Sequence, residues 1–203
     1  MQVQWGTSTI RRAARNAVQH AGIAAAIVVC SGVMLSEMRK ETDMAPRVVQ
    51  QDEFTVVGIA ARTSNAEQMT PEPPIGKQWE RFFREGVLAA IPNKADKNIV
   101  ALYTEYASDK NGEYTYILGA RVMKLEGVPA GMVAKHIPAG RYAVFTSQRG
   151  PVQKVVVEVW QKVWATPKNA LGGNRTYKAD FEVYDQRAQN PADSVVDLYI
   201  GIR

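Results

Sequence analysis

The order of apolar and polar positions predicts two copies of one unit, each made of a strand, a helix and two more strands. In the first copy, β-branched and aromatic residues predict strands at residues 54–60, 98–106 and 113–124. Apolar residues recur at spacings of three and four over residues 75–91, which is typical of an amphipathic helix. Pro92 ends that helix. The Asn111-Gly112 pair predicts a hairpin turn with positive φ between the last two strands.

The second copy opens with an additional strand. Its strand-like runs cover residues 132–137, 141–146, 179–185 and 194–202. Residues 151–165 predict a helix with one broad apolar face, and Pro151 lies in its first turn, where a missing N–H costs nothing. Two such units would pair their antiparallel sheets and place both helices on one face. We therefore predict an α+β domain of tandem β-α-β-β repeats with pseudo-twofold symmetry and a ligand cleft between the halves.

The first 43 residues differ from the rest, so we divide the chain into an extension, residues 1–43, and a domain, residues 44–203. Within the extension, a basic stretch at residues 11–15 precedes an apolar run at residues 21–35. The run is shorter than the 18 or more residues expected of a spanning helix, and no clear cleavage site follows it. Three interpretations stay open: a poorly ordered or weakly helical tail with translation starting at Met44, a membrane-associated helix, or a cleaved export signal.

Composition limits the chemistry of the domain. The chain has 203 residues, of which 46% are hydrophobic and 22% charged, as in ordinary globular proteins. Its single cysteine, Cys30, excludes an internal disulfide and suits a reducing compartment, so we expect a cytoplasmic location. Two histidines and one cysteine are too few and too scattered for a zinc site. Nothing beside Gly172-Gly173 suggests a phosphate loop, and we expect neither a metal nor a cofactor.

The positive charge of the chain raises the question of nucleic-acid binding. The formal net charge is +5, but beyond Met44 the basic residues are interleaved with acids, apart from residues 94–97 and 141–154. Neither of these stretches forms a recognition helix with side chains directed at base edges. We expect no direct DNA binding.

Eight short motifs follow one another along residues 53–203. They are EFTVVGI (53–59), IGKQWERF (75–82), IVALYTEY (99–106), EYTYILG (113–119), VPAG (128–131), IPAGRYAVF (137–145), ADFEVYD (179–185) and VDLYIGI (196–202). This series resembles the GyrI-like effector-binding domain, and is especially similar to its stand-alone members in integron gene cassettes. The resemblance implies a domain that binds small molecules, often lipophilic cations. In AraC-type and MerR-type regulators this domain is fused to a DNA-binding domain, for which the leading residues of this chain are too few.

The resemblance also implies that Glu182, in the Phe-Glu-x-Tyr motif, is the carboxylate of the ligand pocket. A buried, unpaired carboxylate costs several kcal/mol or takes up a proton. A cationic ligand would remove that cost. The alternative is a glutamate that faces solvent, since alternation along a strand puts Asp180, Glu182 and Tyr184 on one face and Asp185 on the other.

Aromatic residues are the second element of the predicted pocket, because a cation over a tryptophan or tyrosine ring gains about 0.5–2 kcal/mol. The predicted ligand-binding residues besides Glu182 are Trp79, Phe83, Tyr103, Tyr116, Trp164 and Tyr184. Core packing is the alternative for each ring, and helical spacing already explains Phe82, Phe83 and Trp160. Trp79 and Tyr116 each carry a polar group that suits a pocket wall.

Three functions are consistent with these residues. The first is a binding module that senses or sequesters a lipophilic, cationic organic molecule. The second, implied by GyrI-like hydrolases of small electrophiles, is an enzyme with Glu182 as general base, assisted by Glu105 or Tyr116. No second acid is placed for it and His136 has no partner, so we assign no catalytic residue. The third is an interaction with a protein such as DNA gyrase. Assembly as a homodimer is left open.

Overall fold

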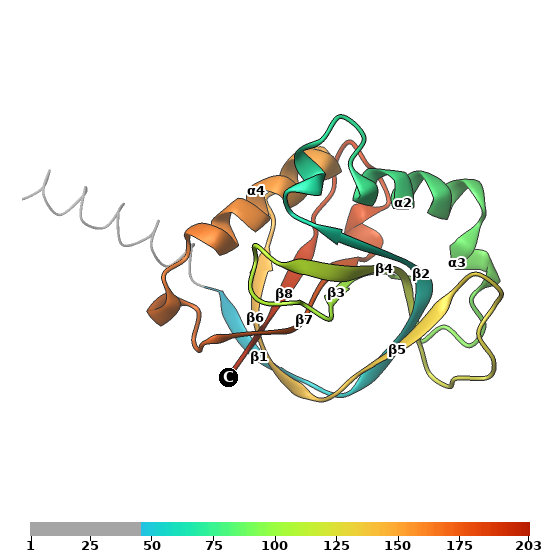
Figure 1. Ribbon diagram of the computed structural model, residues 1–203, viewed down its shortest axis with the longest axis horizontal. Coiled ribbons are helices and arrows are strands. Elements are labelled where there is room, and N and C mark those ends of the chain that lie inside the picture. The colour runs from blue at the N-terminus through green and yellow to red at the C-terminus, as the bar shows by residue number, and fades with distance from the viewer. Residues whose placement is uncertain (1–45) are drawn as a thin grey trace, which may run out of the picture. The chain divides into compact units, whose positions relative to one another are not determined.

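The computed structural model describes residues 46–203, which form one eight-stranded antiparallel sheet and its helices (Figure 1). The strands are β1 (Arg47–Gln51), β2 (Phe54–Ser64), β3 (Ile99–Thr104), β4 (Glu113–Val122), β5 (Val133–Ile137), β6 (Gly140–Thr146), β7 (Arg175–Tyr184) and β8 (Asp197–Ile202). The helices are α2 (Pro74–Arg84), α3 (Val87–Ala90) and α4 (Val152–Ala165). The interpretations of residues 1–43 lie outside this described part. None of the described helices is long and apolar enough to cross a membrane.

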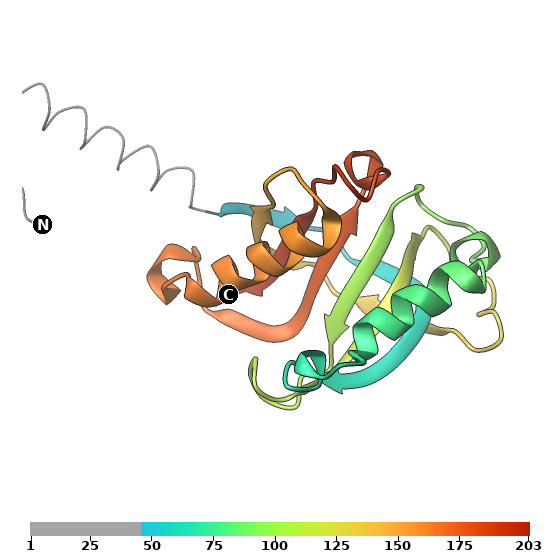
Figure 2. The same ribbon diagram turned by 90° about the horizontal axis from the view of Figure 1, so that it is seen from above.

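The predicted tandem repeat is confirmed. The strand order is β1-β6-β8-β7-β3-β4-β2-β5, so β2, β3 and β4 of the first copy occupy one half of the sheet and β6, β7 and β8 of the second copy the other. The additional strand β5, predicted to open the second copy, pairs with β2 at the edge of the first half. The halves join where β3 pairs with β7, with Ala101 opposite Glu182. Helices α2 and α4 lie on the same face of the sheet, one over each half (Figure 2). The edge strand β1, which pairs with β6, was missed in the sequence because its run of residues is mostly polar and exposed.

The helix predicted over residues 75–91 is interrupted, so the domain has three helices where the sequence predicted two. Helix α2 ends at Arg84, α3 begins at Val87, and Gly86 between them has a φ of 61°. This left-handed conformation ends helices and favours glycine, which has no Cβ to clash. Phe82 and Val87, on either side of the break, are both buried. The apolar face therefore continues through the interruption, which explains why the periodicity predicted one helix.

The turn between β3 and β4 lies where the sequence placed it, but the prediction of positive φ at Asn111-Gly112 was wrong. The residue with positive φ in this connection is Glu105, at 54°. The Asp109 carboxylate accepts a hydrogen bond from the Asn111 N–H at 2.9 Å, and the Asp109 carbonyl accepts one from the Gly112 N–H at 3.1 Å. An aspartate that binds the backbone two residues later makes its own turn, so Gly112 does not need the left-handed conformation.

Each face of the sheet covers its own group of buried side chains. On the helix face, Tyr103, Tyr116 and Leu118 belong to the larger cluster, together with residues of α2 and α4. On the opposite face, Leu102 and Phe181 belong to a second cluster. Since successive side chains of a strand point to opposite faces, the central strands β3, β4 and β7 contribute to both clusters.

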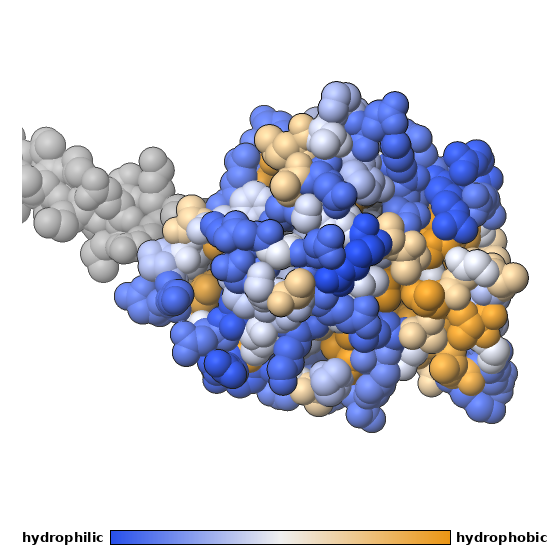
Figure 3. All heavy atoms as spheres, viewed as in Figure 1, coloured by the Kyte–Doolittle hydropathy of each residue, from blue (hydrophilic) through white to orange (hydrophobic). Residues whose placement is uncertain are grey.

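Exposed apolar side chains gather at one end of the domain. Figure 3 shows hydrophobic surface at the end that holds β5 in Figure 1. Large hydrophobic residues that are at least 39% exposed in this segment of the chain are Met123, Leu125, Val128 and Val133. They belong to β5 and to the loop before it, so packing within the sheet does not account for their apolar character.

The close approach of β2 and β4 generates a prediction. Gly58 and Gly119 face each other across these strands, and a Cβ on Gly119 would overlap the carbonyl oxygen of Val57. Gly119→Ala should therefore destabilise the domain by about 1–3 kcal/mol, measured by urea unfolding. Gly76→Ala, in α2, is the matched control. A Cβ at this position would lie 3.4 Å from its nearest neighbour, the side chain of Pro73. The Gly76→Ala change should stabilise the domain by about 0.5–1 kcal/mol. A Gly119→Ala variant as stable as the wild type would refute the close packing.

Candidate ligand-binding site

A carboxylate lies inside the aromatic cluster between the sheet and α4. Glu182, the third residue from the C-terminal end of β7, is 1% exposed. Its Oε1 accepts hydrogen bonds from the Tyr103 hydroxyl at 2.8 Å and from the Trp160 indole N–H at 2.6 Å. Its Oε2 accepts one from the Tyr184 hydroxyl at 2.6 Å. No cationic side chain within residues 46–203 pairs with it, so neutral donors alone hold this carboxylate.

Burial controls the protonation of this group. Burial raises the pKa of Glu182 above its ordinary value of 4.5, and the hydrogen bonds from Tyr184, Trp160 and Tyr103 oppose the rise. Burial, followed by the charge of Glu182, raises the pKa of both Tyr103 and Tyr184 well above 10. The two phenols therefore stay protonated and donate. The site is a weakly acidic carboxyl group that lacks a counter-ion.

Aromatic rings from both halves of the domain surround Glu182. The Tyr103 ring lies 5.1 Å from that of Tyr116 and 4.9 Å from that of Trp160, centroid to centroid. The Trp79 ring, from α2, lies 4.9 Å from that of Tyr184. Edge-to-face pairs at these distances direct the positive edge of one ring to the negative face of another. The same negative faces attract a cation once it displaces a neighbouring ring.

Tyr116 provides a second polar group without a partner. Its ring is fully buried, and its hydroxyl makes no hydrogen bond within the described residues. Burial raises the pKa of Tyr116 well above 10, Glu182 raises it further, and the nearby Trp79 indole lowers it without completing a hydrogen bond. Leaving a buried hydroxyl unpaired costs about 1–3 kcal/mol. The site therefore has both an uncompensated carboxyl group and an unpaired hydroxyl.

Comparison with known proteins identifies the family. A family model described as integron-associated effector binding protein matches residues 47–202. The chain belongs to this family. It is 37% identical to the putative transcriptional regulator protein YobU of Bacillus subtilis over 147 residues. These aligned residues are 72% of this chain and 90% of YobU. It is also 37% identical over 163 residues to the transcriptional regulator BrlR of Pseudomonas aeruginosa, which covers 79% of this chain and 56% of BrlR.

Solved structures share the fold. The integron cassette protein VCH_CASS2, from the mobile metagenome of Vibrio cholerae, superposes with a TM-score of 0.60 at 29% identity, over 78% of this chain and 96% of that one. SAV2435 bound to tetraphenylphosphonium superposes with a TM-score of 0.63 at 20% identity, over 78% of this chain and 93% of that one. The GyrI-like, integron-cassette resemblance predicted from the motifs is confirmed, and so is the α+β architecture.

Two predicted site residues lie at the outer surface of this effector-binding domain. Phe83 is 67% exposed and Trp164 is 41% exposed. Phe83 stacks on Trp79 at 5.7 Å, and Trp164 lies 5.9 Å from Trp160. Helical spacing had suggested that Phe83 packs in the core, which was wrong, because it follows Phe82 by one residue and so points to the side of α2. Both exposed rings extend the aromatic cluster towards solvent.

Trp160 was assigned to core packing, and it does pack, at 9% exposure. It also donates a hydrogen bond to Glu182, a role that its helical spacing did not indicate. A usable signal existed, since a buried indole N–H almost always requires an acceptor. The apolar face of α4 placed Trp160 against the sheet. Only the three-dimensional arrangement shows that the acceptor is Glu182.

Asp180 lies two residues before Glu182, and its surroundings are the opposite. It is fully buried, and its Oδ2 contacts the Arg175 guanidinium at 2.5 Å and the Tyr106 hydroxyl at 2.8 Å. Its Oδ1 accepts a hydrogen bond from the Gly201 N–H at 2.8 Å. The charge of Asp180 is thus neutralised within the fold, which makes it a structural group. Of these two buried carboxylates of β7, Glu182 is the one without a cation.

Of the groups named for hydrolysis, Tyr116 lies in the aromatic cluster around Glu182, but Glu105 and His136 lie elsewhere. Glu105 pairs with Lys135 at 2.5 Å and accepts a hydrogen bond from Thr115 at 2.7 Å. His136 is exposed on the edge strand β5, 3.7 Å from Glu53. The described residues contain no group of three metal-ligating side chains. The site can hold a charge, but the structure brings no second acid to Glu182.

Replacing Glu182 by glutamine tests whether the buried carboxyl group costs stability. Its folded-state pKa is raised, so its contribution to stability is fully present below the unfolded pKa, near 4.5, and is lost as the pH rises through the folded value. Glu182→Gln should therefore be about 1–3 kcal/mol more stable than the wild type at about pH 8. This advantage should shrink as the pH falls towards the unfolded pKa. Urea unfolding across this pH range measures both effects.

The control is Glu158→Gln, which makes the same change on the exposed side of α4. Glu158 has only a distant ion pair, 3.8 Å from Lys154, and a surface pair of this kind contributes little. Its stability difference from the wild type should be small at every pH. A wild type that is more stable than Glu182→Gln at about pH 8 would show that the neutral donors fully compensate the charge.

Proposed function

We propose that this protein binds lipophilic organic cations at Glu182, within the aromatic cluster, and thereby senses or sequesters them. One observation carries the proposal: the carboxyl group is buried, is held by neutral donors alone, and pairs with no cationic side chain of the described residues. A cation placed there supplies the missing charge in surroundings with little water, where electrostatic attraction is strong. The surrounding ring faces add about 0.5–2 kcal/mol each.

The comparisons support the same class of ligand. SAV2435, which shares the fold, is bound to tetraphenylphosphonium, an aromatic cation. YobU and BrlR are described as transcriptional regulators, which suits a domain whose ligand acts as a signal. A ligand of this type combines one delocalised charge with aryl groups, and the site combines one carboxyl group with aromatic walls.

The ligand must displace side chains before it reaches the carboxyl group. Glu182 and Tyr116 are 1% and 0% exposed, while Trp79 and Tyr184 are partly buried and lie in contact with each other. We infer that these two rings separate when the ligand enters. The exposed rings of Phe83 and Trp164 provide the first apolar contact. The Tyr184 hydroxyl loses its bond to Glu182 in this step, and the cation replaces it.

Titration with tetraphenylphosphonium tests the proposal directly. Wild-type protein should bind it, and at a ligand concentration of about 100 times the Kd, unfolding should require about 2.7 kcal/mol more. Glu182→Gln should weaken binding at least tenfold, because only the charge of the site changes. Isothermal titration calorimetry measures the affinity, and thermal unfolding measures the stabilisation.

Two controls separate charge from hydrophobic contact. Tetraphenylborate has the same shape and the opposite charge, so it should not bind at this site. Glu158→Gln should bind tetraphenylphosphonium as the wild type does. Equal affinity of the wild type and Glu182→Gln for the cation, or equal binding of the anion, would rule out recognition by this carboxylate.

Binding should also depend on pH. A cation requires ionised Glu182, and burial raises the pKa of this group, so binding of the cation should release a proton. The affinity of the wild type for tetraphenylphosphonium should fall as the pH is lowered through the folded-state pKa, while that of Glu182→Gln should stay flat. Calorimetry in two buffers of different ionisation enthalpy counts the protons released. Zero release at every pH would contradict a raised pKa in the empty site.

A further inference from the structure

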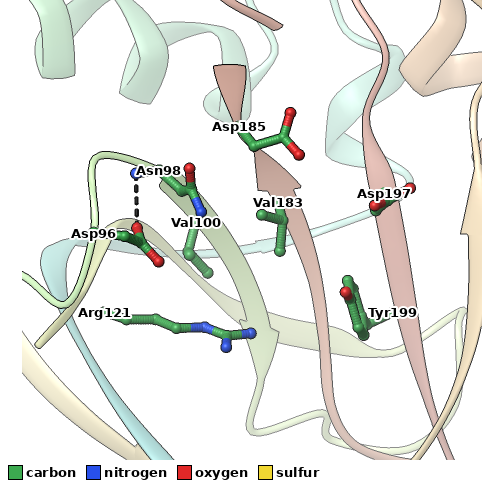
Figure 4. Close-up of a pocket in the computed structure, with 8 residues that line it drawn as sticks. All are labelled: Asp96, Asn98, Val100, Arg121, Val183, Asp185, Asp197 and Tyr199. Carbon is green, nitrogen blue, oxygen red and sulfur yellow. Dashed lines mark hydrogen bonds between the residues drawn. The ribbon is translucent and has the colours of Figure 1, made fainter. Parts of the chain in front are cut away.

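A second site candidate lies on the sheet face opposite Glu182. A cavity of about 220 Å³ opens there, lined by side chains of β3, β4, β7 and β8 and by the loop before β3. Val183, the residue after Glu182, is one of its walls. Figure 4 shows the Arg121 side chain extending into this space, with its guanidinium directed towards Tyr199. The cavity spans the seam between the two halves of the domain.

Arg121 is a cation without an anionic partner. It forms no ion pair with any residue in the described range 46–203, and its Nε is buried without a hydrogen-bond partner. Its guanidinium lies 4.1 Å from the ring centroid of Phe54 and 5.1 Å from that of Phe181. The guanidinium therefore packs against both rings. Burial lowers the pKa of Arg121, and Tyr199 and Asp96 raise it, but an arginine remains charged at neutral pH.

Two of the three carboxylates around the cavity are paired with a cation other than Arg121. Arg187 bridges Asp185 at 2.8 Å and Asp197 at 2.6 Å, and Asp197 also accepts a hydrogen bond from the Thr146 hydroxyl at 2.6 Å. Asp96 accepts the backbone N–H of Asn98 at 2.7 Å. None of the three forms an ion pair with Arg121.

Three lining residues carry side-chain donors that make no hydrogen bond within the described part of the chain. They are the Arg121 guanidinium, the Asn98 amide and the Tyr199 hydroxyl. The Tyr199 ring stacks on Phe181 at 4.5 Å, and Arg121 lies over the same Phe181 ring. The Phe181 ring thus contacts both the Arg121 guanidinium and the Tyr199 ring.

We propose that this cavity is a binding site for a small organic carboxylate, with Arg121 as its charge partner and Tyr199 as a second donor. A planar guanidinium presents a fork of N–H groups that matches both oxygens of a carboxylate. Val100 and Val183 provide apolar walls for the body of the acid. At about 220 Å³ the cavity is below the roughly 300 Å³ at which drug-sized pockets begin, so the ligand is small.

The proposal is independent of cation binding, because the two sites lie on opposite faces of the sheet and share no side chain. The competing explanation is that Arg121 only packs against Phe54 and Phe181. If Arg121 only packs, small anions should not bind beside it, and the charge of Asp96 should not change any such binding. Asp96 is the acid of the cavity that pairs with no cationic side chain of the described chain. The two explanations therefore differ in what small anions do to the protein.

The test is an NMR titration of the full-length chain with benzoate, with 15N labelling that reports the Arg121 Nε–H signal. Wild-type protein should show saturable shifts at this signal and along β4. Arg121→Met retains an apolar side chain of similar length and should weaken benzoate binding at least tenfold. Benzamide, which is neutral and has almost the same shape, should also bind at least tenfold more weakly than benzoate.

Matched variants control for net charge and for folding. Arg141→Met removes an exposed arginine whose one hydrogen bond reaches the carbonyl of Gly172 at 3.4 Å, and it should bind benzoate as the wild type does. Asp96→Asn keeps an oxygen for the Asn98 N–H and removes a negative charge beside Arg121, so it should strengthen binding severalfold. This gain keeps the proposal testable even if Arg121→Met fails to fold.

The opposite results would overturn the proposal. These are the absence of saturable shifts at millimolar benzoate, equal binding by the wild type and Arg121→Met, or no change in affinity with Asp96→Asn. Shifts confined to residues away from Arg121 would also overturn it, because they would place the anion at another surface. Loss of tetraphenylphosphonium binding in Glu182→Gln, with benzoate binding unchanged, would confirm that the two sites are separate.

Discussion

The interaction on which the rest of the structure depends is the attachment of the Glu182 carboxyl group to neutral donors in a buried place. The donors come from β3, α4 and β7, so they meet only where the two halves of the sheet join. A protein interior penalises such a charge, and three neutral hydrogen bonds remove only part of the penalty. Under the proposed function, a bound cation removes the rest of this penalty.

Asp180, on the same strand, is a buried carboxylate with a structural role. Arg175, Tyr106 and a backbone N–H satisfy it completely. Removing one partner of such a buried pair destabilises a protein strongly, because the other charge is left alone. Glu182 already lacks a cationic partner among the described residues, although it accepts three neutral hydrogen bonds. This contrast, rather than burial alone, is the reason why we propose Glu182, and not Asp180, as the ligand-binding group.

Local patterns predicted much of the fold, because the spacing of apolar residues is a property of each element by itself. They failed where contacts between distant residues determine the structure. Strand β1 forms only because β6 pairs with it. Gly86 interrupts a helix although the apolar face continues beyond it. For the site, alternation grouped Asp180 with Glu182, and the family resemblance singled out Glu182. Arg121 was not predicted, because a single arginine in a strand looks like a surface residue until Phe54 and Phe181, far away in sequence, lie beneath it.

Successive side chains of β7 point to opposite faces of the sheet, which determines how two ligands of opposite charge could affect each other's binding. Glu182 faces one side of the sheet and Val183 the other, so the proposed cation and anion sites are separated by a single strand. Ligands influence each other only through a difference between two states of the protein, and any such coupling is reciprocal. Strand β7 is hydrogen-bonded to β3 on one side and β8 on the other, which restrains its displacement. Coupling between the sites therefore requires β7 to move together with its neighbours. If only side chains rearrange when a ligand enters, the two sites bind independently.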